Sequence, residues 1–243
     1  MKKRELFGVR YALGNIDDAV TETKQRIAEL SGKYICFSNV HTLVMAVDHE
    51  GYRKILNRAE YTFPDGAPIA QKLKKMGEKT AERVAGPDFM EAMFKATSDG
   101  RLSHFFFGSN DLTLERLVNN IKSSYPTINI AGKYSPPFRK LTDAEDSEIT
   151  ELINGSGADI VWIGLGAPKQ EIFMRSHLNQ IKGLMMGVGA GFDYLAGTAK
   201  RAPLWMQRAS LEWLYRLISE PERLAKRYLV TNAKFIGYCL TKR

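Results

Sequence analysis

Short apolar runs alternate along the chain with longer stretches in which apolar residues recur at helical spacing. The longer stretches favour helices at residues 17–30, 39–58, 67–76, 89–97, 111–123 and 142–154. The short runs are rich in β-branched and aromatic residues, as buried strands are, and cover residues 34–37, 61–63, 104–108, 128–131, 159–164 and 183–188. Strands that alternate with helices predict an α/β fold, in which a Rossmann-like, mostly parallel sheet lies between flanking helices.

The pattern changes in the last fifth of the chain. No strand pattern follows residue 196, and residues 197–243 favour two or three helices in which aromatic and leucine residues are mixed with basic ones. We therefore predict two parts, an α/β core at residues 1–196 and a basic helical appendage at residues 197–243.

The net charge of +8 belongs almost entirely to the appendage, because residues 200–243 hold ten basic residues against three acidic ones. Such a segment indicates an anionic partner. Arg216, Arg223 and Arg227 would share one face of a continuous helix. A membrane surface fits better than nucleic acid, because no nucleic-acid motif is present and the tryptophans have the spacing of a helix core. A solvated charged face on a packed helix pair is the alternative.

The remaining bulk features narrow the class of protein. The 243 residues suffice for a sizeable core, and no run approaches the ~20 apolar residues of a membrane span. The basic start lacks the apolar segment of a signal peptide. Cys36 and Cys239 lie far apart, and the four histidines show no spacing typical of metal ligands. We therefore expect a cytoplasmic protein without a disulfide framework, a metal or a cofactor.

One strand-to-helix junction carries the strongest local signal for a binding site. A buried strand ends in Gly-Leu-Gly-Ala-Pro-Lys-Gln-Glu, where Gly164 and Gly166 favour a tight turn and let a ligand approach the backbone. Pro168 suits the first turn of a helix. Free N–H groups at that helix start, together with Lys169 and Gln170, would bind a substrate phosphate. An ordinary turn with a solvated lysine explains the same pattern.

Other polar clusters also follow predicted strands, and ligands of parallel sheets bind at the carboxyl ends of strands. These clusters cover residues 39–42, 65–66, 108–111 and 189–193. Asp65 is the candidate base, because it follows a strand in an exposed turn and could take a proton from an attacking hydroxyl. An aspartate bonded to its own backbone is the structural alternative.

Two other enzyme classes fit less well. A glycoside hydrolase normally needs two carboxylates that flank the sugar, and Asp65 is the single good candidate. A nicotinamide enzyme is suggested by Gly187, Gly189 and Gly191, but these glycines come too late, since no βαβ unit follows them. No Asp-x-Asp pair is present to hold a divalent ion, so phosphate charge would meet backbone N–H groups and cations such as Arg83.

Several segments together resemble one family, in the right order and over nearly the whole chain. The family is that of the WecG/TagA/CpsF glycosyltransferases, glycosyltransferase family 26. The run Gly-x-Gly-x-Pro-Lys-Gln-Glu with a late Glu-Trp-Leu-Tyr-Arg is specific to it. The matching segments are Asn39 with His41-Thr42, Phe63–Gly66, Arg83–Asp88, Phe107-Gly108, Gly164–Glu171, Gly187–Asp193, Arg201–Trp205, Glu212–Arg216 and Glu220–Arg223.

This resemblance implies an inverting, metal-independent transfer of a sugar from a UDP-sugar to a polyprenyl-diphosphate-linked sugar. The best-known members add N-acetylmannosamine to undecaprenyl-diphosphate-linked N-acetylglucosamine, for teichoic-acid linkage units or enterobacterial common antigen. Others add glucose or a uronic acid for exopolysaccharide or capsule. Phe37 stands where the teichoic-acid members have a small hydroxyl residue, which leaves the donor sugar open, with N-acetylmannosamine as the first expectation.

The resemblance also implies roles for individual residues. Asp65 matches the family's general base, and Arg83 and Gln170 match residues near the diphosphate and sugar. The family's arginine-rich appendage touches the membrane and completes the active site. We expect further substrate contacts from Asn39, Thr42, Gly108, Gly164, Gly166, Lys169 and Asp193, and lipid-diphosphate or membrane contacts from Arg208, Arg216, Arg223 and Arg227.

The expected partners are a UDP-sugar donor, a polyprenyl-diphosphate-linked acceptor and an anionic membrane surface, with no nucleic acid. The protein would lie peripherally on the inner face of the cell membrane, and a homo-oligomer is a further possibility. A non-catalytic module that binds a UDP-sugar or a lipid is the hypothesis from another class, and the intact Asp65 disfavours it.

Overall fold

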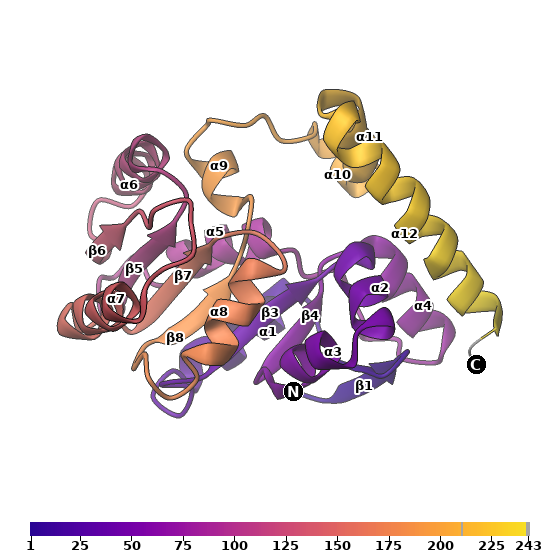
Figure 1. Ribbon diagram of the computed structural model, residues 1–243, viewed down its shortest axis with the longest axis horizontal. Coiled ribbons are helices and arrows are strands. Elements are labelled where there is room, and N and C mark those ends of the chain that lie inside the picture. Colours follow the sequence, from indigo (N-terminus) through magenta and orange to yellow (C-terminus); the bar gives the residue numbers. More distant parts are fainter. Residues whose placement is uncertain (210, 242–243) are drawn as a thin grey trace.

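A computed structural model describes residues 1–209 and 211–241, and leaves the side chains of Leu204, Arg208 and Arg223 undescribed. The core is a six-stranded, parallel sheet with the strand order β4-β3-β8-β7-β5-β6 (Figure 1). This confirms the predicted α/β, Rossmann-like class. The strands are β3 (Tyr34–Ser38), β4 (Tyr61–Pro64), β5 (Ser103–Gly108), β6 (Asn129–Tyr134), β7 (Ile160–Gly164) and β8 (Leu184–Gly187).

Helices connect the strands and cover the sheet. Local capping starts several of them: Asn39, Asn110 and Thr142 each accept backbone N–H groups from the first turn of the helix that follows. The helices of the core are α1 (Ile16–Gln25), α2 (Val40–Asp48), α3 (Glu50–Arg58), α4 (Ala67–Lys75), α5 (Gly86–Ala96), α6 (Asp111–Ser124), α7 (Asp143–Gly155), α8 (Lys169–Ser176) and α9 (Gly191–Leu195).

Successive strand residues enter opposite cores, because side chains alternate across a sheet. In β5, Phe105 and Phe107 belong to the core cluster that includes residues of α2, α3, α4, α7 and α8, whereas Phe106 belongs to the cluster that includes residues of α1, α5, α6 and α9. The connection after β5 therefore leads to one face of the sheet, and the connection after β7 leads to the other. In open α/β sheets, ligands bind at the carboxyl edge where neighbouring connections diverge in this way.

One predicted helix is two helices in the structure. The stretch 39–58 divides into α2 and α3, because His49 adopts an extended conformation with φ −127° and ψ 105°. Two predicted boundaries also differ. The first helix ends at Gln25 rather than residue 30, and the helix predicted from residue 89 begins at Gly86, so that Gly86-Pro-Asp88 forms the first turn of α5. Proline is compatible with a first helical turn because its missing N–H has no partner there.

The sequence reasoning missed an N-terminal antiparallel hairpin. Strands β1 (Lys3–Leu6) and β2 (Val9–Ala12) pair through a two-residue turn at Phe7 and Gly8, whose φ angles are 52° and 85°. Positive φ at both central residues is the signature of a tight hairpin turn. The Phe-Gly pair between short alternating segments was the available signal.

The appendage consists of α10 (Leu204–Arg208), α11 (Glu212–Ser219) and α12 (Pro221–Thr241). A break at Glu220, with φ −138° and ψ 59°, precedes Pro221, so Arg216 lies on α11 and Arg227 on α12, and the two do not share one continuous helix. Helix α12 runs beside α2 (Figure 1). Lys234 Nζ lies 2.6 Å from Asp48 Oδ2, and Phe235 meets Phe7 edge-on with ring centroids 6.3 Å apart. Among the described residues, no helix is long and apolar enough to cross a membrane.

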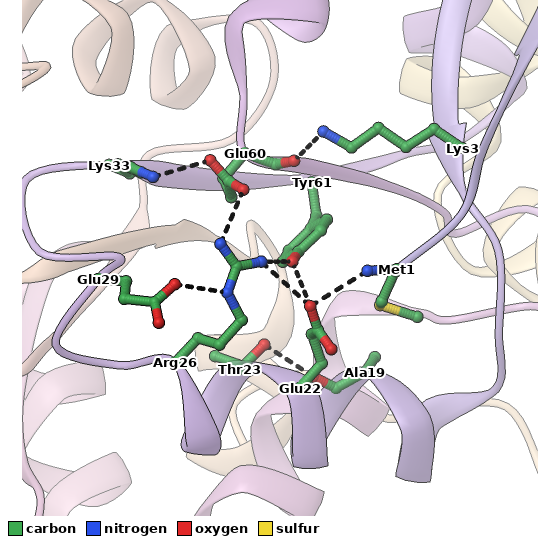
Figure 2. A network of polar contacts seen from close by, with 10 residues as sticks. All are labelled: Met1, Lys3, Ala19, Glu22, Thr23, Arg26, Glu29, Lys33, Glu60 and Tyr61. Atoms are coloured by element: carbon green, nitrogen blue, oxygen red, sulfur yellow. Dashed lines mark hydrogen bonds and ion pairs between the residues drawn. The ribbon is translucent and has the colours of Figure 1, made fainter.

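A network of charges ties α1 to the amino-terminal edge of the sheet. Figure 2 shows the Glu22 carboxylate facing the Tyr61 hydroxyl, at 2.6 Å, and the Arg26 guanidinium, at 3.1 Å, on one side and the Met1 amine, at 3.1 Å, on the other. Arg26 also reaches Glu29 and Glu60, with nitrogen–oxygen distances of 2.9 Å and 3.6 Å. Hydrogen bonds from Tyr61, then from the Met1 amine and Arg26, lower the pKa of Glu22 from 4.5 to about 2.

We predict that Glu22→Gln destabilises the fold by about 1 kcal/mol at pH 7, because a charged acceptor is lost at a partly exposed site. A lowered pKa stabilises the fold above the unfolded-state value and loses that effect as the pH falls through the folded-state value. The difference between the wild type and the variant should therefore shrink below about pH 4.5 and vanish near pH 2. Urea unfolding across this range measures it; a difference independent of pH would contradict the assignment.

Candidate active site

Asp65 lies half-buried at the carboxyl edge of the sheet, directly after β4. Its backbone N–H donates to the Ser38 carbonyl oxygen at 3.0 Å, which joins it to the end of β3. The next residue, Gly66, caps α4 and lies against the start of α2, since a Cβ on Gly66 would be 3.6 Å from Asn39 Cα. The structure thus places Asp65 below the surface, not in the exposed turn that the sequence predicted.

Arg83 connects the core to the appendage. Its Nη1 lies 2.8 Å from Asp88 Oδ2 in α5, and its Nη2 lies 2.7 Å from Glu212 Oε2 in α11. Arg201 also contacts both carboxylates, with Nε at 3.5 Å from Glu212 Oε1 and a close contact from Nη2 to Asp88. The four alternating charges are about three-quarters shielded from solvent, so each depends on its opposite neighbours.

The same charges act on Asp65. Burial raises the pKa of its carboxyl above the ordinary value; Arg83 opposes this rise, Glu212 and Asp88 add to it, and Arg216 opposes it. A carboxylate whose proton affinity is raised is better suited to act as a general base near neutral pH than an ordinary surface aspartate.

The start of α2 lies next to Asp65. Asn39 Oδ1 accepts from the backbone N–H groups of His41 and Thr42 at 3.0 Å and 3.3 Å. The buried Thr42 hydroxyl lies 2.9 Å from Ser38 Oγ, which in turn lies 2.9 Å from the Tyr11 hydroxyl. These hydrogen bonds assign Asn39 and Thr42 to the architecture of the edge, and direct substrate contact by either remains a prediction.

His41 is a site residue that the sequence reasoning did not select. Its side chain is half-buried, and Nδ1 has no hydrogen-bond partner among the residues that the structure describes. Burial and the nearby Arg227 lower the pKa of His41, which favours the neutral ring. Its position two residues after Asn39 in the family-like segment was the only available signal.

The glycines after β5 and β7 serve close packing. A Cβ on Gly108 would lie 2.6 Å from the Gly164 carbonyl carbon, and a Cβ on Gly164 would lie 2.5 Å from the Phe192 ring. Close approach by neighbouring protein atoms therefore explains both glycines. Gly166, with φ +74°, has no neighbour within 4 Å of the position that a Cβ would take, so it is the glycine that leaves room for a ligand.

The turn into α8 places its polar residues at different depths. Pro168 is the N-cap of α8, just before the helical turn in which it was predicted. Lys169 is exposed, whereas Gln170 is buried and donates from Nε2 to Glu171 Oε1 at 2.9 Å and to the Gly187 carbonyl oxygen at 3.1 Å. Asp193, in α9, closes the following turn through its carbonyl oxygen.

The structure describes the side chains of two of the four arginines that were predicted to contact the lipid diphosphate or the membrane. Both act on the candidate site from the appendage. Arg216 in α11 and Arg227 in α12 are half-buried, and the Nε atom of each lacks a hydrogen-bond partner among the described residues. The charge of Arg216 acts on Asp65, and that of Arg227 acts on His41. The side chains of Arg208 and Arg223 lie outside the described residues.

The described part of the chain contains no group of three histidine, cysteine or carboxylate side chains that could hold a metal ion. Asp65 at the carboxyl edge is thus surrounded by two guanidinium groups, Arg83 and Arg216, and two carboxylates, Glu212 and Asp88.

Comparison with known proteins identifies the family. The model of the glycosyl transferase WecG/TagA/CpsF family matches residues 4–243. The chain belongs to this family of glycosyltransferases. It is 30% identical over 193 residues to the N-acetylglucosaminyldiphosphoundecaprenol N-acetyl-beta-D-mannosaminyltransferase of Bacillus spizizenii, a match that covers 79% of this chain and 73% of the relative.

The charge network predicts how the appendage is held. Glu212→Ala removes the appendage carboxylate that meets Arg83 and Arg201, so the segment 197–211 should open more often. We expect trypsin to cleave at Lys200, Arg201 or Arg208 roughly tenfold faster in native conditions, a change of about 1.4 kcal/mol in opening free energy.

Glu222→Ala, at an exposed position in the first turn of α12, is the matched control and should leave the cleavage rate unchanged. Equal cleavage rates in Glu212→Ala and the wild type would show that the network does not hold the appendage.

Proposed function

We propose that the protein transfers N-acetylmannosamine from UDP-N-acetylmannosamine to undecaprenyl-diphosphate-linked N-acetylglucosamine, with inversion and without a metal. The observation that carries the proposal is the half-buried Asp65 beside Arg83 and Arg216 at the carboxyl edge. The proposal is supported by the relative from Bacillus spizizenii, whose name states the transferred N-acetylmannosaminyl group and the lipid-linked acceptor.

The proposed transfer reaction needs one base for the acceptor hydroxyl and positive charge for the leaving UDP. Asp65 takes the proton of the acceptor hydroxyl, and the resulting oxygen attacks the anomeric carbon from the side opposite UDP. The carbon–oxygen bond to UDP breaks, and its electron pair leaves with the diphosphate. Arg83 and backbone N–H groups stabilise that negative charge, which is the role that a metal ion has in other glycosyltransferases. A single displacement by a single base gives inversion.

The donor and the acceptor would be bound by different elements of the structure. The loops after β5, β7 and β8 would hold the donor, with Gly166, Lys169 and Gln170 nearest to it. Arg216 and Arg227, together with Arg208 and Arg223, would bind the diphosphate of the lipid acceptor. The unpaired Nε atoms of Arg216 and Arg227 support this role, because a buried guanidinium N–H without a partner is costly.

We propose that residues 197–243 act as a membrane-associating unit, which would place the protein peripherally on the cytoplasmic face of the cell membrane. Trp205, predicted as a core residue, is 63% exposed. On α12, Leu229, Ile236 and Leu240 are 76%, 58% and 79% exposed and share one face through spacings of seven and four. Exposed apolar side chains among basic ones fit an anionic bilayer surface.

The donor sugar has a second candidate, glucose or a uronic acid, because Phe37 departs from the teichoic-acid members. In the structure its ring packs with Phe63 and Phe89 at centroid distances of 5.8 Å and 5.2 Å. Phe37 therefore changes the core beneath the site and does not favour one sugar by direct contact.

The decisive assay measures UDP release with a panel of UDP-sugars and an undecaprenyl-type diphosphate-N-acetylglucosamine acceptor. We expect acceptor-dependent release from UDP-N-acetylmannosamine that EDTA does not change. Asp65→Asn should lower kcat by at least about 100-fold, since general base catalysis contributes that much. Wild-type activity should fall as the pH drops through the raised pKa of Asp65, because the base becomes protonated.

The melting temperature is the control for this comparison, because it shows whether Asp65→Asn loses activity through unfolding. A raised pKa means that ionised Asp65 weakens folding at pH 7, so Asp65→Asn should melt at or above the wild-type temperature. If UDP is released only from another UDP-sugar, that sugar is the donor and the assignment of N-acetylmannosamine is wrong. Loss of activity with EDTA would refute metal independence. Full activity of Asp65→Asn would refute the role of Asp65 as the base.

Membrane association is tested by sedimentation with anionic vesicles. Leu229→Ser combined with Leu240→Ser should weaken binding at least roughly tenfold, because about 1 kcal/mol or more of apolar burial is lost per side chain. Leu112→Ser, an equally apolar change at a 58% exposed position on α6, is the matched control and should bind as the wild type does. If the double variant binds vesicles as well as the wild type does, α12 does not contact the membrane.

A further inference from the structure

The Gln170 side chain is held in one orientation at the carboxyl edge. Its Nε2 donates to Glu171 Oε1 at 2.9 Å and to the Gly187 carbonyl oxygen at 3.1 Å, so both N–H hydrogens have acceptors. An amide rotated by 180° would set its oxygen against those two acceptors. The observed orientation turns Oε1 toward Gly189, where a Cβ would lie 3.5 Å from that oxygen.

Gln170 Oε1 is buried and has no hydrogen-bond partner in the described chain. An unsatisfied buried acceptor costs about 1–3 kcal/mol, and an isolated case in a native fold requires an explanation. The oxygen lies where the loops after β7 and β8 meet, since the Cβ position of Gly189 is also 4.0 Å from Gly166 Cα. A ligand there meets an acceptor, so a hydroxyl or N–H group fits and a phosphate oxygen does not.

Glu171 is the buried group that sets this orientation, and neither the sequence reasoning nor the transfer mechanism uses it. It is 1% exposed, and its second oxygen, Oε2, has no hydrogen-bond partner among the described residues. The Tyr52 hydroxyl from α3 faces the carboxyl group without reaching hydrogen-bond geometry. Burying a carboxyl group here opposes folding, so stability does not account for it.

We propose that Glu171 is a positioning residue: it holds the Gln170 amide so that Oε1 accepts a hydrogen bond from a hydroxyl or the acetamido N–H of the donor sugar. The inference rests on the proposed function, which supplies the sugar. It assigns Gln170 to the sugar and not to the diphosphate. Glu171 acts only through Gln170 and touches no reacting atom.

The test compares kcat and KM for UDP-N-acetylmannosamine at a saturating concentration of the lipid acceptor. Glu171→Met removes the acceptor for Gln170 Nε2 at similar volume, and should lower kcat/KM about tenfold, mainly through KM. Glu171→Gln keeps a side-chain oxygen that can accept from Nε2, and should stay within twofold of the wild type. The dissociation constant of UDP, which lacks the sugar, should be unchanged in both variants.

A double-mutant cycle separates positioning from a structural role. Gln170→Ala should lower kcat/KM about as much as Glu171→Met, and adding Glu171→Met to Gln170→Ala should change it by less than twofold. Independent effects that multiply would overturn the proposal, as would equal losses in Glu171→Gln and Glu171→Met. A wild type without transfer from UDP-N-acetylmannosamine would instead overturn the proposed function, before any substitution is made.

A second measurement, made on the wild type, tests the proposal if Glu171→Met does not fold. The side-chain NH2 signals of Gln170, identified by their loss in Gln170→Ala, should exchange slowly with solvent, because both hydrogens are bonded and buried. These signals should shift on addition of UDP-N-acetylmannosamine but not of UDP. Fast exchange, or the same shift with UDP alone, would overturn the proposal.

Discussion

The pairing of Arg83 with one carboxylate of the core and one of the appendage sets the geometry of the candidate active site. Asp88 and Glu212 approach the two ends of the same guanidinium, and Arg201 closes the network from the other side. Partly buried charges of this kind are costly when a neighbour is missing, so the network favours one position of α11. That position brings Arg216 within electrostatic reach of Asp65. One set of charges thus holds the appendage and also acts on the carboxyl group of the proposed base.

The carboxyl edge of the sheet depends on buried polar groups as well as on the apolar core. Hydroxyl groups of Tyr11, Ser38 and Thr42 form a chain of contacts beside the start of α2, and Gln170 is bonded to Glu171 in the first turn of α8. In a low-dielectric interior such groups fix one another's orientation, because each has few alternative partners. The edge that would bind substrates is therefore held by fixed polar contacts.

Much of the fold could be predicted because its determinants are local. Alternation of apolar runs with amphipathic stretches located every strand of the sheet, and capping residues such as Asn110 and Thr142 located helix starts. The predictions that the structure corrects also have physical explanations. The extended His49 divides a stretch whose apolar spacing is continuous, and the backbone break at Glu220 places Arg216 and Arg227 on two separate helices. The β1–β2 hairpin was missed because β1 reads Lys-Arg-Glu-Leu, with three exposed charged residues in place of the apolar run of a buried strand.

The sequence by itself determined the fold class, the family resemblance and the presence of Asp65, Gln170 and their neighbours at the ends of strands. Periodicity, turn chemistry and strand order are enough for that, since parallel strands end at one edge. Only the tertiary structure decided that Arg83 meets Glu212, a residue 129 positions away, that the Gln170 oxygen lacks a partner, and that Trp205 is exposed. These properties arise from burial and from contacts between distant segments, which local sequence patterns do not encode.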